Sequence, residues 1–177
     1  MRALRYHGPM DLRLDDLPEP KCGPTQVKIR PAFVGICGTD LHEYHTQTFV
    51  PKHALVEPLA VAWHAIILSG IKAGESSLVV GTGPIGLAVI QCLKAMDAGD
   101  IIAVEVAAKR QEFAKQFGAT HVLDPTQVDV VKEARKLTCG RGPSVAFDCA
   151  GVPSSLESST RAVCAHGTVV NVAIVSL

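Results

Sequence analysis

From residue 77 onward the sequence alternates short apolar runs with amphipathic stretches, and this alternation restricts the possible folds more than any other feature. Apolar runs separated by amphipathic helices predict parallel strands that are covered on both faces. Because crossovers between parallel strands are right-handed, we expect a doubly wound α/β sheet with strand order 3-2-1-4-5. The predicted strands are 77–80, 100–106, 120–124, 144–150 and 168–174, with a helix after each of the first four.

A glycine-rich loop joins the first of these strands to the first helix. Its sequence, VVGTGPIGL, places Gly81, Gly83 and Gly86 in the spacing G-x-G-x-x-G, with Pro84 and Ile85 between the last two glycines. The first glycine permits a tight turn, the second lets the backbone approach a pyrophosphate, and the third lets helix and strand pack closely. The N-terminus of the helix then offers N–H groups to the phosphates. This context predicts a dinucleotide site.

An acidic residue near the end of the second strand supports the same prediction. Glu105 lies about 20 residues after the loop, where its carboxylate would accept hydrogen bonds from the ribose hydroxyls of an adenosine. The carboxylate would also repel a 2′-phosphate, so we expect NAD in preference to NADP. Arg110 is the alternative determinant, because an arginine in this place can bind a 2′-phosphate. The non-functional interpretation is a packing turn followed by a solvated glutamate.

The N-terminal part of the chain has a different pattern. Residues 1–44 alternate charged and apolar side chains in short stretches, which predicts antiparallel strands. Residues 45–55 have no clear period and are interpreted as a connection, and residues 57–70 are predicted to form a helix. We therefore expect two domains, at 1–55 and 56–177.

The composition argues against several classes of partner. The chain has 17 basic and 17 acidic residues and no long run of either sign, which argues against nucleic acid and an anionic membrane surface. No apolar stretch reaches the roughly 18 residues of a membrane span. The N-terminus lacks the apolar core of an export signal. None of the six cysteines forms a C-x-x-C pair, so we expect reduced thiols and a cytoplasmic protein.

The segment VGICGTDLHEYHTQTF, residues 34–49, is rich in side chains that bind metals. Cys37 precedes His42, Glu43 and His45 by a few residues. Adjacent residues of a strand point to opposite faces, so this segment cannot supply three zinc ligands by itself. A reduced cysteine in a turn with surface histidines is the alternative interpretation.

Four segments of the sequence are distinctive when taken together: VGICGTDLHEY, ALVEPLAVAWHA, VVGTGPIGL and VAFDCAG. They resemble the zinc-dependent medium-chain alcohol and polyol dehydrogenases, most of all their butanediol and sorbitol dehydrogenase members. The resemblance implies an NAD-binding Rossmann domain at 56–177 and a remnant of a GroES-like catalytic domain at 1–55. It also implies an oxidoreductase that transfers hydride between a secondary alcohol and NAD.

The resemblance further implies roles for particular residues. Cys37 matches a ligand of the catalytic zinc, Thr39 matches a residue that relays the alcohol proton, and Glu57 matches a glutamate at the metal. Zinc would polarise the alcohol and lower its pKa. The other positions that match cofactor-binding residues of the family are Ile85, Glu105, Arg110, Val172, Ala173 and Ile174.

The sequence also departs from the family. It has neither the Gly-His-Glu stretch that carries the second zinc ligand nor a lobe of four closely spaced cysteines, and we expect a chain shortened internally and at its C-terminus. His45 and His53 are the alternative zinc ligands. Three hypotheses follow: a zinc- and NAD-dependent oxidoreductase, a non-catalytic NAD-binding protein, and a truncated gene product. The exact alcohol and the formation of a homo-oligomer stay open.

Overall fold

The computed structural model describes residues 2–8, 10–19, 21–24 and 56–173. The chain divides into two compact units, Met1–Leu55 and Val56–Leu177. Three of the predicted site residues, Cys37, Thr39 and Ile174, lie outside the described residues.

The first unit contains a two-stranded antiparallel sheet. Strand β1 (Arg2–Gly8) pairs with β2 (Asp11–Asp16), and Leu4 stands opposite Leu14 in the register. This hairpin confirms the predicted pair of antiparallel strands at the N-terminus. The side chains of Leu12 and Leu14 are exposed, so the two strands bury little apolar surface of their own.

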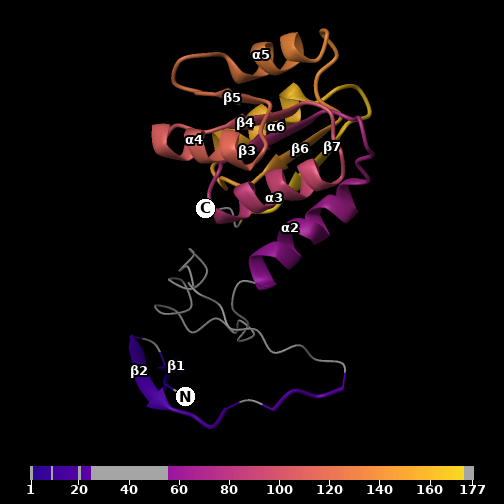
Figure 1. Ribbon diagram of the computed structural model, residues 1–177. Coiled ribbons are helices and arrows are strands. Elements are labelled where there is room, and N and C mark those ends of the chain that lie inside the picture. Colours follow the sequence, from indigo (N-terminus) through magenta and orange to yellow (C-terminus); the bar gives the residue numbers. More distant parts are fainter. Residues whose placement is uncertain (1, 9, 20, 25–55, 174–177) are drawn as a thin grey trace. The chain divides into compact units, whose positions relative to one another are not determined.

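The second unit is built on a five-stranded parallel sheet (Figure 1). Its strands are β3 (Ser77–Val80), β4 (Ile101–Val104), β5 (His121–Leu123), β6 (Val145–Asp148) and β7 (Thr168–Asn171). They are ordered β5-β4-β3-β6-β7, and every neighbouring pair is parallel. This arrangement confirms the predicted doubly wound α/β class and the strand order 3-2-1-4-5.

Helices cover both faces of the sheet. They are α2 (Val56–Ser69), α3 (Pro84–Ala95), α4 (Ala108–Phe117), α5 (Val130–Leu137) and α6 (Pro153–Ala162). On one face, α2, α3 and α4 pack over a core that includes Val79, Ala103 and Phe147. On the other face, α5 and α6 pack over Leu78 and Ile102. Successive residues of each strand enter opposite cores, which explains why the strand sequences are apolar without interruption.

Local signals in the sequence fix several helix ends. Pro84 begins α3, where its missing N–H has no intrahelical partner to lose. The Asp129 side chain caps α5 by accepting a hydrogen bond from the Lys132 backbone N–H at 3.1 Å. Helix α4 ends at Gly118, whose φ of 125° is unfavourable for residues with a Cβ. Because α3, α4, α5 and α6 each follow a strand of the parallel sheet, their N-termini lie toward the carboxyl edge of the sheet.

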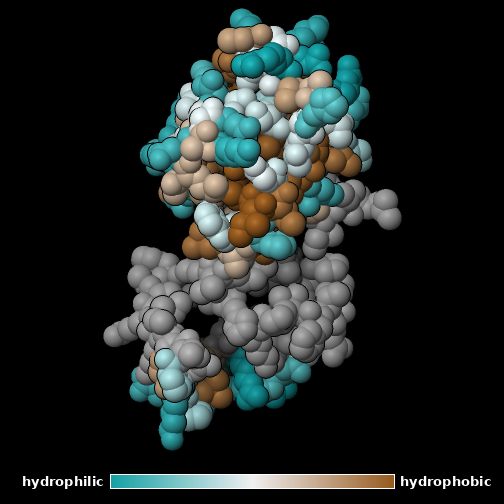
Figure 2. Space-filling model, turned by 90° about the vertical axis from the view of Figure 1, so that its right-hand side faces the viewer, coloured by the Kyte–Doolittle hydropathy of each residue, from teal (hydrophilic) through white to brown (hydrophobic). Residues whose placement is uncertain are grey.

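Helix α2 carries apolar side chains on two sides. Ala62, Ala65 and Ile66 are buried in the core beside α3. The other side is exposed, and Figure 2 shows apolar side chains gathered on this part of the unit. The exposed large apolar residues of α2 are Leu59, Trp63, Ile67 and Leu68.

The length of the helices also bears on a membrane location. Helix α2, the most apolar of them, has 14 residues. Within the described part of the chain, none of the helices combines the length and the hydropathy needed to cross a bilayer.

Candidate functional site

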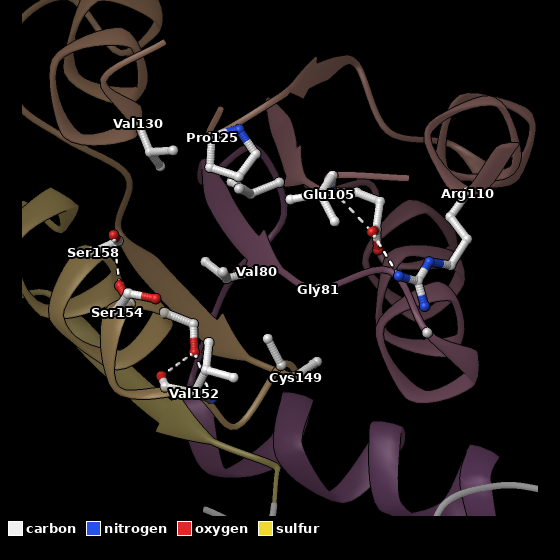
Figure 3. A pocket seen from close by; sticks show the side chains of 15 residues that line it. Val80, Gly81, Glu105, Arg110, Pro125, Val130, Cys149, Val152, Ser154 and Ser158 are labelled. Atoms are coloured by element: carbon white, nitrogen blue, oxygen red, sulfur yellow. Dashed lines mark hydrogen bonds and ion pairs between the residues drawn. The ribbon is translucent and has the colours of Figure 1, made fainter. Parts of the chain in front are cut away.

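A cavity of about 590 Å³ opens at the carboxyl ends of β3, β4 and β6 (Figure 3). The chain crosses to opposite sides of β3 at this point of the sheet, and open α/β folds bind their ligands at such a switch point. The glycine loop forms the floor of the cavity. Glu105 and Arg110 line one side, Pro125 lies above them, and Ser154 and Ser158 of α6 line the far side.

Two of the three loop glycines are required by the packing of the loop itself. Gly81 has a φ of 90°, and a Cβ added to it would lie 2.9 Å from the Ala150 Cβ. A Cβ on Gly86 would collide with the carbonyl oxygen of Gly81. These contacts agree with the turn and packing roles that the sequence predicts for these two glycines.

Gly83 is different, because it needs no special conformation. Its φ of −68° is open to any residue, and a Cβ built there meets nothing within 4 Å. The space beside Gly83 is therefore open, and the residue also stands as the N-cap of α3 without a side chain to accept a hydrogen bond. The first turn of a helix has N–H groups without intrahelical partners. Pro84 and Ile85 occupy this turn. The open space beside Gly83 and the uncapped start of α3 together leave room for an anion.

Glu105 follows β4 and turns its carboxylate toward the glycine loop. Its side chain is only 4% exposed. Oε2 accepts from the backbone N–H and the hydroxyl of Thr82, both at 3.0 Å. Oε1 accepts from the N–H groups of Val106 and Ala107 at 3.0 Å and lies 2.9 Å from Nη2 of Arg110. The predicted acidic residue is thus held by five donors at the cavity wall.

These donors control the charge of Glu105. Burial raises the pKa of the Glu105 carboxyl. Hydrogen bonds and a nearby positive charge outweigh this effect and lower the pKa; they come from the N–H groups of Ala107 and Thr82, the Thr82 hydroxyl and Arg110. The net result is a pKa below the ordinary value of a glutamate. Glu105 is therefore an ionised carboxylate near neutral pH, although it is almost completely buried.

Arg110 reaches the same carboxylate from the first turn of α4. Its side chain is 51% exposed, and it contributes one guanidinium nitrogen to the ion pair with Glu105. The guanidinium lies on the cavity wall and presents further N–H donors to it. Both determinants that the sequence offers for cofactor choice, Glu105 and Arg110, are thus brought together.

The turn after β6 forms the opposite border of the glycine loop. Asp148 is fully buried, and its Oδ1 accepts from the N–H groups of Ala150 and Gly151 and from the Ser155 hydroxyl. Its backbone carbonyl accepts from the N–H groups of Val172 and Ala173 at 2.9 and 3.0 Å. These two predicted cofactor residues therefore stand at the carboxyl edge of the sheet, although they do not line the described cavity.

A cysteine also lines the cavity. Burial, assisted by the neighbouring charge of Asp148, raises the pKa of Cys149 to about 12. The side chain is therefore a neutral thiol at physiological pH and contributes an apolar surface rather than a nucleophile.

The predicted zinc residues are not assembled in the described part of the chain. Glu57 lies in the first turn of α2, and Cys37 and Thr39 fall outside the described residues. Among the described residues, no group of three or more His, Cys, Asp or Glu side chains could hold a metal ion.

Several cavity residues have no signal in the sequence pattern. Pro125 and Ser158 come from connections and helices far apart in the chain, and only the folded sheet brings them together. Thr82 lies beneath the cavity wall and was not predicted either. Its position inside the glycine motif was the one available signal, because a hydroxyl in that loop can reach the acidic residue of the next strand.

Comparison with known proteins identifies the group to which the chain is related. The family model described as zinc-binding dehydrogenase matches residues 84–177. The (R,R)-butanediol dehydrogenase of Bacillus subtilis (strain 168) is 30% identical over 270 residues, which cover 98% of this chain and 78% of that protein. The alignment is longer than the 177 residues of this chain, so the relative contains residues that have no counterpart here.

Solved structures give the same relationship. The crystal structure of 2R,3R-butanediol dehydrogenase from Bacillus subtilis has a TM-score of 0.78 and 28% identity, and covers 96% of this chain and 77% of its own. A structure from Sinorhizobium meliloti 1021, named as a zinc-binding dehydrogenase bound to NADP, has a TM-score of 0.64 and 37% identity. It covers 67% of this chain, which spans only 35% of that protein. With the family match over more than half of its residues, the chain belongs to the zinc-binding dehydrogenase family.

Proposed function

We propose that the cavity binds the adenosine and pyrophosphate parts of NAD. The observation that carries this proposal is the ionised Glu105 carboxylate, held against the glycine loop at the switch point of the sheet. Glu105 would face the ribose hydroxyls, and Gly81, Gly83 and the start of α3 would face the phosphates. Val106 and Pro125 offer apolar surface to an adenine. The nicotinamide of a bound NAD would supply the hydride acceptor.

The other predicted cofactor residues belong to the second half of this site. Val172 and Ala173 follow β7 and are held by the Asp148 carbonyl at the edge where the strands end. We propose that they lie toward the nicotinamide ring, and that Ile174 is a further cofactor residue by resemblance. Pro84, Ile85 and Gly86 form the first turn of α3 and would support the pyrophosphate from below.

We infer that the chain is an oxidoreductase of the alcohol dehydrogenase type, acting on a secondary alcohol similar to a butanediol or a polyol. The family match and the butanediol dehydrogenase relatives support this inference. Thr39 is the proposed group that relays the alcohol proton. Cys37 and Glu57 are proposed zinc residues by resemblance alone, because the described part of the chain supplies no zinc site.

A non-catalytic NAD-binding protein is the second candidate. The supporting observation is that the described residues that line the cavity lie between Val80 and Ser158, within the second unit. The described lining of the cavity thus belongs to the unit that is proposed to bind NAD. In this proposal residues 56–177 are the NAD-binding domain, and residues 1–55 are a remnant of a GroES-like catalytic domain.

Two further proposals concern the protein in the cell. A cytoplasmic location is proposed because none of the six cysteines belongs to a C-x-x-C motif in the sequence. A homo-oligomer is proposed by analogy with oligomeric dehydrogenases, and sedimentation of the purified chain would test it.

One set of measurements separates the candidates. Calorimetric titration of the purified chain with NAD should give saturable binding, and the absence of binding would refute both candidates. Zinc per chain and the oxidation of butanediol or sorbitol with NAD then distinguish them. Turnover above background that is lost in Cys37→Ser would establish the oxidoreductase. Binding of NAD with substoichiometric zinc and no turnover would establish the non-catalytic protein.

A further inference from the structure

Thr82, the second residue of the glycine motif, is a buried polar residue that is 0% exposed. Its backbone N–H and its hydroxyl donate hydrogen bonds to the same acceptor atom, Oε2 of Glu105, both at 3.0 Å. Its hydroxyl oxygen also lies 3.4 Å from the Arg110 carbonyl oxygen, so the residue stands between the loop, the acidic residue and α4.

The two oxygens of Glu105 are held in different ways. Oε1 accepts from the N–H groups of Val106 and Ala107, which follow Glu105 directly in the chain, and from the Arg110 side chain. Among the described residues, Oε2 accepts hydrogen bonds from Thr82 alone, in the loop 23 residues earlier. The orientation of the carboxylate relative to the glycine loop therefore depends on Thr82.

This orientation bears on the choice between the two nicotinamide cofactors. Arg110 forms an ion pair with the same carboxylate through one nitrogen, and its other N–H groups are available to a 2′-phosphate. A carboxylate fixed toward the loop keeps its negative charge at the ribose, where it favours free hydroxyls over a phosphate. A carboxylate that has lost its hydrogen bond to Thr82 can rotate toward Arg110. The negative charge then moves away from the loop, and the positive guanidinium becomes the dominant charge at the ribose.

We propose that Thr82 is a positioning residue that sets the preference of the site for NAD over NADP by holding Glu105. The proposal rests on the proposed function, because it requires that the cavity bind a nicotinamide dinucleotide. Thr82 itself does not line the cavity, so its effect on a ligand passes through the Glu105 carboxylate.

Thr82→Val is the direct test, because valine keeps the shape of threonine and its backbone N–H but removes the hydroxyl. A hydrogen bond to a charged group contributes enough that we expect NAD to bind about tenfold more weakly to this variant. NADP should bind as well as, or better than, it does to the unchanged chain. Thr82→Ser keeps the hydroxyl and should restore the original ratio of the two affinities. Both dissociation constants are measured by calorimetry at one ionic strength.

Each result has a defined meaning. An equal loss of NAD and NADP affinity, an unchanged ratio, or a chain that does not prefer NAD from the start would overturn the role of Thr82. An unchanged ratio in a chain that binds NAD leaves the proposed function intact. Absence of binding of either cofactor to the unchanged chain would refute the proposed function and this inference together. If Thr82→Val does not fold, as judged by circular dichroism, Thr82→Ala gives the same comparison without a branched side chain.

Discussion

Gly81, Gly83 and Gly86 occupy one short motif, but each lacks a side chain for a different physical reason. A Cβ added to Gly81 would crowd Ala150, and a Cβ added to Gly86 would collide with the carbonyl oxygen of Gly81. A Cβ added to Gly83 would meet nothing within 4 Å, and the backbone of Gly83 is in an ordinary conformation. The absence of a Cβ at Gly83 therefore serves no packing purpose within the described residues, and the remaining reason is access for a ligand.

Gly83→Ala should separate ligand binding from folding. We expect an unchanged midpoint of thermal unfolding and a loss of NAD affinity of at least tenfold, because the new methyl group would fill the space proposed for the pyrophosphate. Gly86→Ala is the matched control. It should lower the midpoint of unfolding, because its Cβ collides with the backbone of the loop. Unchanged NAD affinity in Gly83→Ala, measured by calorimetry, would contradict the assigned phosphate position.

Glu105 predicts a particular dependence of stability on pH. Its pKa is lowered in the folded state, so its charge stabilises the fold above the pKa of about 4.3 that an unfolded glutamate has. This contribution is lost as the pH falls through the lower, folded pKa. We expect Glu105→Gln to lower the free energy of unfolding at pH 7, and the difference from the unchanged chain to shrink as the pH approaches 3. Urea titrations at several pH values measure this difference in the free energy of unfolding. A difference that does not change with pH would contradict the stabilising role of the ionised Glu105.

At the scale of elements, the connection between β6 and α6 depends on a single buried carboxylate. Asp148 ends β6, and its Oδ1 receives three hydrogen bonds from the first residues of the connection and of α6. The same connection contacts the glycine loop through Ala150. The side chain thus fixes the β6–α6 turn in the position that borders the cavity.

Asp148→Ala should therefore destabilise the second unit strongly. The change leaves the N–H groups of Ala150 and Gly151 without their acceptor, and an unsatisfied buried group such as the Gly151 N–H costs about 1–3 kcal/mol. We expect a loss of about 3 kcal/mol in the free energy of unfolding, measured by urea titration. Asp124→Ala is a control, since Asp124 accepts from Thr126 in an exposed turn after β5 and its removal should have a much smaller effect. Equal effects of the two changes would argue against the buried cap.

The elements were largely predictable because their signals are local. The stop of α4 at Gly118 and the inward position of Ala134 follow from the sequence period and hold in the structure. The strand predicted at 100–106 is shorter, because Glu105 and the residues after it leave the sheet to form the turn that the carboxylate holds. The contribution of Thr82 was not predictable, since it depends on a burial that only the packed loop creates.

At the scale of the whole molecule, the two units differ in how much core they have. The second unit has two apolar cores on the two faces of one sheet. The described part of the first unit is a two-stranded sheet whose leucines at positions 12 and 14 are exposed. Isolated two-stranded sheets are marginally stable in water.

Hydrogen exchange should report this difference directly. We expect the amides of β1 and β2 to exchange much faster than those of β3, β4 and β6, because local opening of a sheet without a core requires little free energy. Mass spectrometry of peptides from the exchanged protein measures both groups in one sample. Equal protection of the two sheets would show that the first unit has a stabilising partner surface.

The thiol of Cys149 has a practical consequence for work with this protein. Alkylating reagents react with thiolates, and a thiol whose pKa is about 12 is almost entirely protonated at pH 8. Cys139 is exposed in the turn after α5 and is not among the described residues that line the cavity. Maleimide chemistry at mildly alkaline pH should therefore label Cys139 and spare Cys149. A fluorophore can thus be attached to the second unit without modifying the wall of its cavity.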